Sequence, residues 1–323
     1  CVAQADLVLS GSAEATYTSS SVTSTGNGFG LSNEFTLTGT GEMDNGFTYT
    51  AHTNFAGQDM GTDSNYLKVD MGAMGTVSLD QGSEQAGISK MVNFGNPSAY
   101  EEAGHGVSTL GDKLDNNWHG AIGYNNTMMG VTVSIEVNPT NNAAATQAGG
   151  MTGAGSTASN ANYSLKYAVD GVDGLSVTYA TGEDSSVGNV NDATMLKGSY
   201  AYGPVTVAYS DYEYDAQTDS ADDEMTSYKV SYTVSDELSV SYGQEEITTN
   251  STSAEYEMIS ASYTAGGMTI TASMSDATDI DGTTSATEDR ERWALGASSV
   301  SYTHLRAHET REDRVCRRVR EKK

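Results

Sequence analysis

Hydrophobic and polar residues alternate with a period of two along most of the chain. In residues 6–17, Leu7 and Leu9 fall on one face, whereas Ser10 and Glu14 fall on the other. A β-strand places successive side chains on opposite faces, so this period predicts strands with one apolar and one polar face. The pattern recurs in about sixteen segments, near residues 6–17, 32–42, 46–55, 64–72, 74–81, 117–126, 129–138, 163–169, 173–182, 193–202, 204–214, 228–234, 236–247, 254–265, 268–274 and 288–299.

The connections between these segments are of two alternating kinds. Every second connection is short and rich in turn formers, such as Asp44-Asn45-Gly46, Asn125-Asn126 and Gly203-Pro204. A meander of antiparallel strands would place all short turns at one rim of a barrel and all long connections at the other. The longer, polar connections lie near residues 18–31, 57–63, 82–116, 139–160, 183–192, 215–223, 248–253 and 277–287.

Two segments fit the alternation poorly. In residues 204–214 the spacing of the tyrosines leaves Asp211 on the apolar face. In residues 254–265 the apolar face changes between Met258 and Ile259, which predicts a β-bulge at that point.

Charged side chains within the strands fall on the polar face, as Lys68, Lys166, Lys197, Lys229 and Arg292 show. No helical pattern could cover the apolar faces of sixteen strands, so a second sheet or lipid must do so. A two-sheet sandwich is one possibility. A closed transmembrane barrel is more economical, because closure pairs every backbone group and leaves no open edge. Aromatic girdles are expected from residues near strand ends: Tyr17, Trp118, Tyr124, Tyr214 and Trp293.

Composition and charge then exclude several classes of protein. The formal charge of −27 makes nucleic acid a poor partner, since its binding needs a basic surface. No apolar run reaches the roughly 18 residues of a spanning helix. Two cysteines at opposite ends form no disulfide scaffold. The hydrophobic content of 37% is low for a large soluble protein, but it suits a barrel in which only one face of each strand contacts lipid.

The two ends of the chain differ from the body. Ala3-Gln4-Ala5 fits a secretory cleavage site, so residues 1–5 are predicted to be a signal-peptide remnant; a lipidated Cys1 is the alternative. Residues 300–323 contain many bases, and from Ser301 onward they resemble the translated read-through of a sequencing adapter. We therefore predict an artefactual tail there and a barrel over residues 6–299. A basic arm for an anionic partner is the other interpretation of the tail.

The body resembles the general porins of Gram-negative outer membranes, in particular those of alphaproteobacteria, including marine ones. The resemblance spans residues 6–299, and its clearest segments are 32–42, 74–82 and 292–297. It implies a 16-stranded antiparallel transmembrane barrel with short periplasmic turns, long outer loops and an inward-folded third loop. It also implies a homotrimer surrounded by outer-membrane lipid and lipopolysaccharide, forming a water-filled pore for ions and small hydrophilic solutes without a cofactor.

The third long connection, residues 82–116, is then expected to narrow the pore. Its charged residues are Glu84, Lys90, Glu101, Glu102, Asp112, Lys113 and Asp115. The predicted pore wall contributes Lys68, Asp70, Lys166, Lys197, Lys229 and Arg292. Acids on an inward loop that face a basic wall would set a transverse field and select solutes by charge. The acidic body suggests a mild cation preference. The simpler interpretation is a hydrated loop and wall lysines that pair with neighbouring acids.

Catalysis has little support in the sequence. His52, His105 and His119 have no spacing partner for zinc, and no nucleophile motif with a plausible triad stands out. We therefore expect no enzyme activity and no metal site. The alternative function is a secreted or cell-surface β-rich adhesin or binding protein without a pore, although such adhesins would show a fixed repeat, which we do not find.

Overall fold

The computed structural model describes residues 6–21, 28–57, 61–81, 85, 121–138, 160–186, 189–217, 222–249, 252–280 and 289–306. These residues form sixteen strands and one 3-10 helix at Gly72–Met74. The strands are β1 (Asp6–Ser20), β2 (Phe29–Glu42), β3 (Thr48–Ala56), β4 (Gly61–Asp70), β5 (Thr76–Gln81), β6 (Ala121–Met128), β7 (Val131–Asn138), β8 (Asn160–Ala168), β9 (Leu175–Ser186), β10 (Asn189–Tyr202), β11 (Val205–Asp215), β12 (Asp223–Thr233), β13 (Leu238–Thr249), β14 (Thr252–Ala265), β15 (Met268–Thr278) and β16 (Arg290–Arg306).

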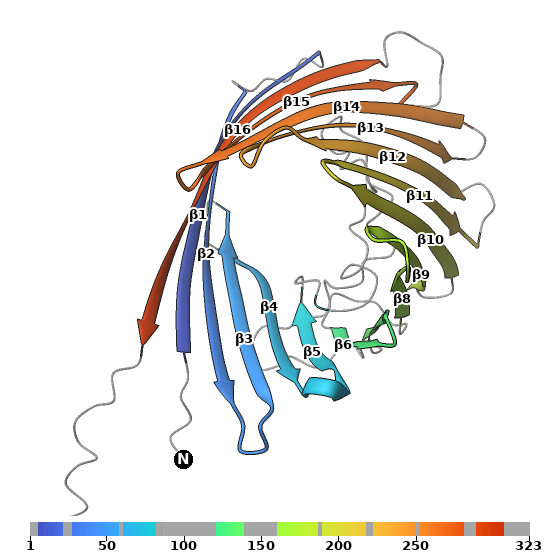
Figure 1. Ribbon diagram of the computed structural model, residues 1–323. Coiled ribbons are helices and arrows are strands. Elements are labelled where there is room, and N and C mark those ends of the chain that lie inside the picture. Colours follow the sequence, from blue (N-terminus) through green and yellow to red (C-terminus); the bar gives the residue numbers. More distant parts are fainter. Residues whose placement is uncertain are drawn as a thin grey trace, which may run out of the picture.

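The sheet closes on itself. Each strand pairs antiparallel with its neighbours in sequence, and β1 pairs with β16 to complete the barrel (Figure 1). The sixteen-stranded barrel expected from the alternation is therefore confirmed. The predicted end of the barrel at residue 299 falls inside β16, which continues to Arg306 opposite Asp6. The nature of the chain ends stays a prediction.

Paired residues on neighbouring strands form one continuous apolar face around the barrel. Leu67 of β4 pairs with Leu79 of β5, Leu79 pairs with Ile122 of β6, and Ile122 pairs with Val137 of β7. These side chains are exposed, and most exposed large hydrophobic residues of the strands share their face. The opposite face is polar and more buried, as the inside of a ring must be. The apolar face therefore points outward and forms a band suited to hydrocarbon.

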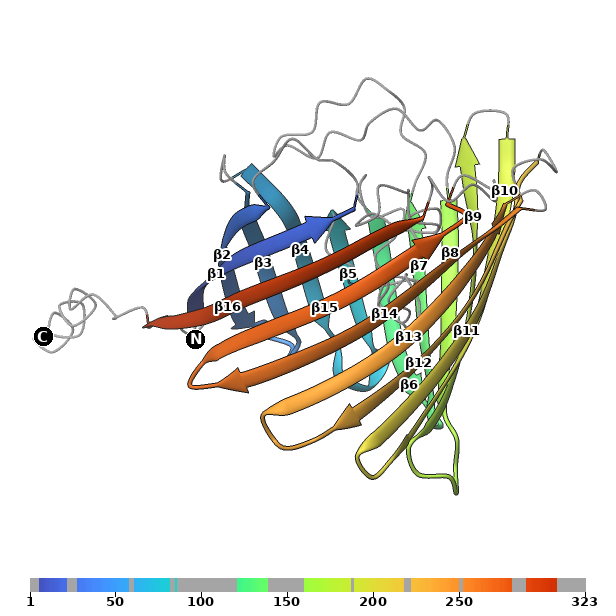
Figure 2. The same ribbon diagram turned by 90° about the horizontal axis from the view of Figure 1, so that it is seen from above.

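The two rims of the barrel differ. The tight turns after β2, β4, β6, β8, β10, β12 and β14 lie at what we call the short-turn rim, and several of these hairpins are visible in Figure 2. The other connections lie at the long-loop rim. Two connections that we expected to be long, 183–192 and 248–253, are nearly absent, because β9 ends at Ser186 before β10 starts at Asn189, and β13 ends at Thr249 before β14 starts at Thr252.

Toward the long-loop rim the two faces exchange character. The outward face becomes acidic there: Glu213 pairs with Glu224, and Glu246 pairs with Glu255. The inner face becomes apolar and buried, and it forms a cluster on the inner side of β9–β15. We call this group the inner apolar cluster; its members are Ala180, Ala193, Met195, Tyr212, Tyr214, Met225, Ile247, Ala254, Tyr256, Met258 and Ala277.

This exchange explains both misfits of the sequence pattern. Asp211 does lie on the outward face, just above the apolar band, and Tyr212 turns inward. The bulge expected between Met258 and Ile259 is wrong, because β14 pairs in continuous register with both neighbours. Tyr214 is likewise not part of an outer girdle, since it belongs to the inner apolar cluster. A register shift is found instead between Asn54 and Phe55 of β3.

One short turn is displaced from its predicted place. Asn125 and Asn126 lie within β6, and the chain turns at Met129 and Gly130. These two residues have φ values of 53° and 79°, the pair of positive values that a two-residue hairpin of type I′ requires. Gly130 meets this requirement at no cost, whereas the two asparagines sit where the ladder needs extended backbone.

The turn between β8 and β9 provides a test of this hairpin chemistry. Gly171 and Gly174 both have positive φ, 81° and 84°. A Cβ at Gly174 would overlap the backbone carbonyl of Ala201, whereas a Cβ at Gly171 meets nothing within 4 Å. We expect Gly171→Ala to cost about 1 kcal/mol through backbone strain alone. Gly174→Ala should cost about 2 kcal/mol more, because the backbone itself must move. Denaturant unfolding in detergent measures both, and equal losses would contradict the close approach of Gly174 to Ala201.

The acidic outward face provides a second test. Glu246 and Glu255 are exposed and directly opposite, so their charges repel. We expect Glu255→Gln to stabilise the barrel by about 0.5 kcal/mol at low salt, and by less at high salt. In a Glu246→Gln background the same change should bring no gain. The thermal midpoints of the unmodified protein and the three variants measure the coupling, and an unchanged effect in that background would refute the repulsion.

Candidate functional site

The candidate site is the inner wall of the barrel. Register places all six predicted wall residues on the inward face: Lys68 and Asp70 on β4, Lys166 on β8, Lys197 on β10, Lys229 on β12 and Arg292 on β16. Each alternates with residues of the outward band, as Lys68 does with Leu67. The role of these residues in selecting solutes stays a prediction.

The predicted constriction loop can be followed only at its start. Glu84, Lys90, Glu101, Glu102, Asp112, Lys113 and Asp115 lie outside the described residues. Gln85 is described, and its carbonyl accepts a hydrogen bond of 2.7 Å from the Nδ2 of Asn125. Asn125 points inward on β6, four residues nearer the short-turn rim than Ala121, the partner of Asp80 on β5. Gln85 therefore lies inside the barrel, which is the direction that an inward loop requires.

The wall at β2–β4 carries a cluster of polar and aromatic side chains. The hydroxyl of Thr38 lies 3.1 Å from the Nδ1 of His52. The His52 ring stacks on Tyr66 with a centroid distance of 4.5 Å, and the Nζ of Lys68 lies 5.5 Å from the centre of the Tyr66 ring. Lys68 thus places its charge over an aromatic face, an arrangement that holds a cation in place.

The wall at β8–β12 carries three lysines on alternate strands. Lys166, Lys197 and Lys229 lie close enough that the charges of the outer two act on Lys197. Between them the wall presents hydroxyl groups, and those of Thr178 and Ser210 are on buried residues. This part of the lumen therefore has a positive lining that lies over buried hydroxyl groups.

Acids gather on a different part of the wall. Glu14 of β1 and Glu34 of β2 point inward and are exposed. In a ring of sixteen strands, β1 and β2 lie opposite β9 and β10, as Figure 1 shows. The described wall therefore places the acids of β1 and β2 across the lumen from the lysines of β8–β12, while Lys68 of β4 and Arg292 of β16 flank the acids. The sequence pattern placed Glu14 and the lysines on the polar faces of their strands, but it could not show that the two groups are opposed.

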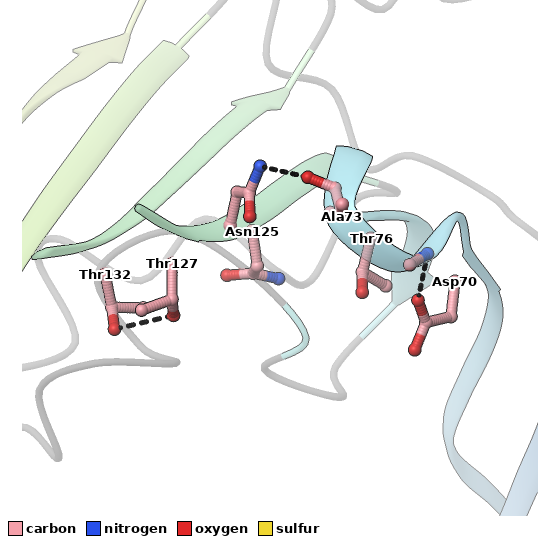
Figure 3. A pocket seen from close by; sticks show the side chains of 9 residues that line it. Asp70, Ala73, Thr76, Asn125, Thr127 and Thr132 are labelled. Atoms are coloured by element: carbon pink, nitrogen blue, oxygen red, sulfur yellow. Dashed lines mark hydrogen bonds between the residues drawn. The ribbon is translucent and has the colours of Figure 1, made fainter. Parts of the chain in front are cut away.

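A polar pocket of about 440 Å³ lies at the short-turn rim between β4 and β7 (Figure 3). The backbone N–H of Gly72 donates to Asp70 at 2.8 Å, and the Nδ2 of Asn126 donates to the carbonyl of Ala73 at 3.3 Å. The hydroxyls of Thr127 and Thr132 are 2.9 Å apart. The bond between Asn126 and Ala73 joins the two hairpins at the mouth of the barrel, and each of the other two contacts lies within one hairpin.

The inner apolar cluster was not foreseen from the sequence. Tyr212 and Tyr256 are each only 1% exposed although both point into the barrel. The two misfits at Asp211 and at Met258 were its signal, because each marks the point where the apolar side chains change face.

Two other kinds of feature are absent from the described residues. They contain no helix long and apolar enough to span a membrane. They also contain no group of three or more histidine, cysteine, aspartate or glutamate side chains that could hold a metal ion.

Comparison with solved structures identifies the same fold. The in-vitro folded trimer form of OmpT, an outer membrane protein of Vibrio cholerae, is 13% identical over 92% of this chain and 100% of that chain, with a TM-score of 0.64. Salmonella typhi OmpF in complex with daunomycin is 12% identical over 92% and 97%, with a TM-score of 0.64. A substituted Rh. blastica porin is 14% identical over 92% and 100%, with a TM-score of 0.60.

Sequence comparison adds the family. No curated protein sequence matches the chain. A family model described as Gram-negative porin matches residues 1–256, which is most of the chain. With the closed barrel and its outward apolar band, this match shows that the chain belongs to the Gram-negative porin family and is a channel protein of the outer membrane.

Proposed function

We propose that the protein forms a water-filled channel for passive diffusion of ions and small hydrophilic solutes across the outer membrane. The observation that carries this function is the division of the closed barrel into an outward apolar band and an inward polar wall. A barrel of sixteen strands is too wide to be filled by its own side chains, so water occupies the lumen. A secreted adhesin, our alternative from the sequence, is not favoured, because an adhesin would need no such band.

A mild preference for cations is the second part of the proposal. The acidic side of the wall at Glu14 and Glu34 offers cations a path away from the lysines of β8–β12. The chain as a whole is strongly acidic, with a formal charge of −27. Charges that line a narrow aqueous path raise the local concentration of counter-ions, so cations should be enriched at this wall.

The assembly and surroundings follow from the family. We propose a homotrimer embedded in outer-membrane lipid and lipopolysaccharide, with no catalytic activity. The trimer form of the Vibrio cholerae protein OmpT supports this assembly, because its fold matches the present barrel over the whole of that chain.

Adjacent positions of β12 test whether the lumen is wet. Ser231 points inward and Tyr232 points outward, where it is 46% exposed. In a background with Cys1→Ser and Cys316→Ser, we expect Ser231→Cys in reconstituted protein to react with a charged, membrane-impermeant thiol reagent and to lose conductance. Tyr232→Cys should not react, because lipid covers it. Equal labelling of both would contradict a water-filled lumen bounded by a lipid-facing wall.

Reversal potentials in a potassium chloride gradient test the selectivity. We expect discrete conductance steps in planar bilayers and a reversal potential whose sign shows that potassium is more permeant than chloride. The double variant Glu14→Gln, Glu34→Gln should lower the ratio of potassium to chloride permeability by roughly twofold, since it removes the acidic side.

The control is Glu255→Gln, which removes a charge from the outward face and should leave the ratio nearly unchanged. Anion preference of the unmodified protein would refute the cation path, and the absence of conductance would refute the channel.

A further inference from the structure

Two of the three lysines of the basic wall, Lys166 and Lys197, belong to one continuous row of paired residues, and Lys229 lies beside the end of that row. Lys166 of β8 pairs with Thr178 of β9, and Thr178 pairs with Lys197 of β10. Lys197 pairs with Ser210 of β11, which pairs with Ser227 of β12. Lys229 lies on the same face two residues from Ser227. We call this set the lysine row: Lys166, Thr178, Lys197, Ser210, Ser227 and Lys229.

The spacing of the lysine row suits an anion shared between ammonium groups. Neighbouring strands are about 4.8 Å apart, so lysines on alternate strands have backbones about 10 Å apart. Their flexible side chains can converge on a small ligand between them. The charges of Lys166 and Lys229 both reach Lys197, which is the central lysine of the three.

Hydroxyl groups complete the row. Ser210 and Ser227 lie with their Oγ atoms 2.8 Å apart, and Thr178 is buried between Lys166 and Lys197. These buried hydroxyls form the base of the wall beneath the lysines, and the ammonium groups are the groups that can form charge-assisted hydrogen bonds to an oxyanion. The ammonium groups can therefore bind the several oxygens of phosphate more strongly than a bare halide.

The charges around the row are also suited to an anion. Among the described inward side chains of β8–β12, the acid is Asp223, six residues from Lys229 toward the long-loop rim. Glu245 of β13 pairs with Ser227 and ends the row on that side. Within the described residues, none of the three lysines has a hydrogen-bond or ion-pair partner. Three like charges in this position repel one another, and an anion bound between them would relieve the repulsion.

The row also leads to an opening. Lys166 pairs on its other side with Thr132 of β7, whose hydroxyl contacts Thr127 in the polar pocket at the short-turn rim (Figure 3). The row thus runs without interruption from the mouth of the barrel into the lumen. The first lysine, Lys166, lies on the strand next to this pocket, whose lining also includes Asp70.

We propose that the lysine row is a binding site inside the channel for small phosphate-type oxyanions, either free or carried on a small solute. This site rests on the proposed channel function and refines it. Cations would pass along the acidic side of the wall, while phosphate-bearing solutes would be held and passed along the basic side.

Block of single-channel current by phosphate tests the site. The full chain is reconstituted in planar bilayers at about 0.1 M potassium chloride and pH 8, where screening is moderate. Inorganic phosphate, hexose phosphate and neutral hexose are titrated separately. We expect phosphate to reduce the current with a saturating dependence on concentration, and neutral hexose to have no such effect. Block by inorganic phosphate alone would identify a free ion as the ligand, and block by both phosphates would identify the phosphate group.

Substitutions connect the block to the row. Lys197→Gln should raise the half-blocking concentration about tenfold, because it removes a charge-assisted hydrogen bond at the centre of the row. Lys229→Gln should raise it less, and Lys197→Arg should preserve the block. Lys68→Gln is the matched control, since Lys68 is an inward lysine on another wall, over the Tyr66 ring. It should raise the half-blocking concentration far less than Lys197→Gln does.

Two results would overturn the lysine row as a binding site. One is a channel that conducts but shows no saturable block by either phosphate, which would leave the channel function intact. The other is an equal effect of Lys68→Gln and Lys197→Gln, which would mean that phosphate senses only the overall charge of the lumen. A protein that shows no conductance steps would overturn the channel and the site together.

Discussion

The structure depends on the need to pair every backbone N–H and C=O group away from water. Hydrocarbon offers these groups no partner, so a sheet that crosses a membrane must have no free edge. The pairing of β1 with β16 removes the last two edges. Once the ring is closed, each strand has an inward and an outward face. The alternation of apolar and polar side chains then places apolar residues against lipid and polar residues against water. The outward band and the lysine row are two results of this closure.

Near the long-loop rim the same strands meet a different solvent. Beyond the hydrocarbon, water lies outside the barrel, and outward positions such as Glu213 and Glu246 are acidic. The inner positions Tyr212 and Tyr256 are buried, as in a soluble protein. One strand therefore has its apolar side chains outward over part of its length, as in a membrane protein, and inward over the rest, as in a soluble protein. This change of face, rather than a bulge, accounts for the break in the alternation at Met258.

Much of the fold could be predicted, because alternation is a local property that each strand carries in its own residues. All sixteen strands and the inward direction of Lys166, Lys197 and Lys229 follow from it. The turn at Met129 and Gly130 could not be placed, because Asn125 and Asn126 resemble turn formers equally well. The row that joins Lys166 to Lys197 through Thr178 was also beyond prediction, since it depends on the register between strands, and a shift of two residues would keep each face and break the row.

The strands of the barrel are inclined, and this inclination gives the row of paired residues a slope. Thr132 is the second residue of β7 after the short turn, whereas Ser210 is the sixth residue of β11. Side chains that are neighbours around the ring therefore stand at increasing heights in the lumen. Charged residues that pair across neighbouring strands therefore follow a spiral path along the wall. An ion that moves from one lysine to the next changes its depth in the membrane as well as its position on the wall.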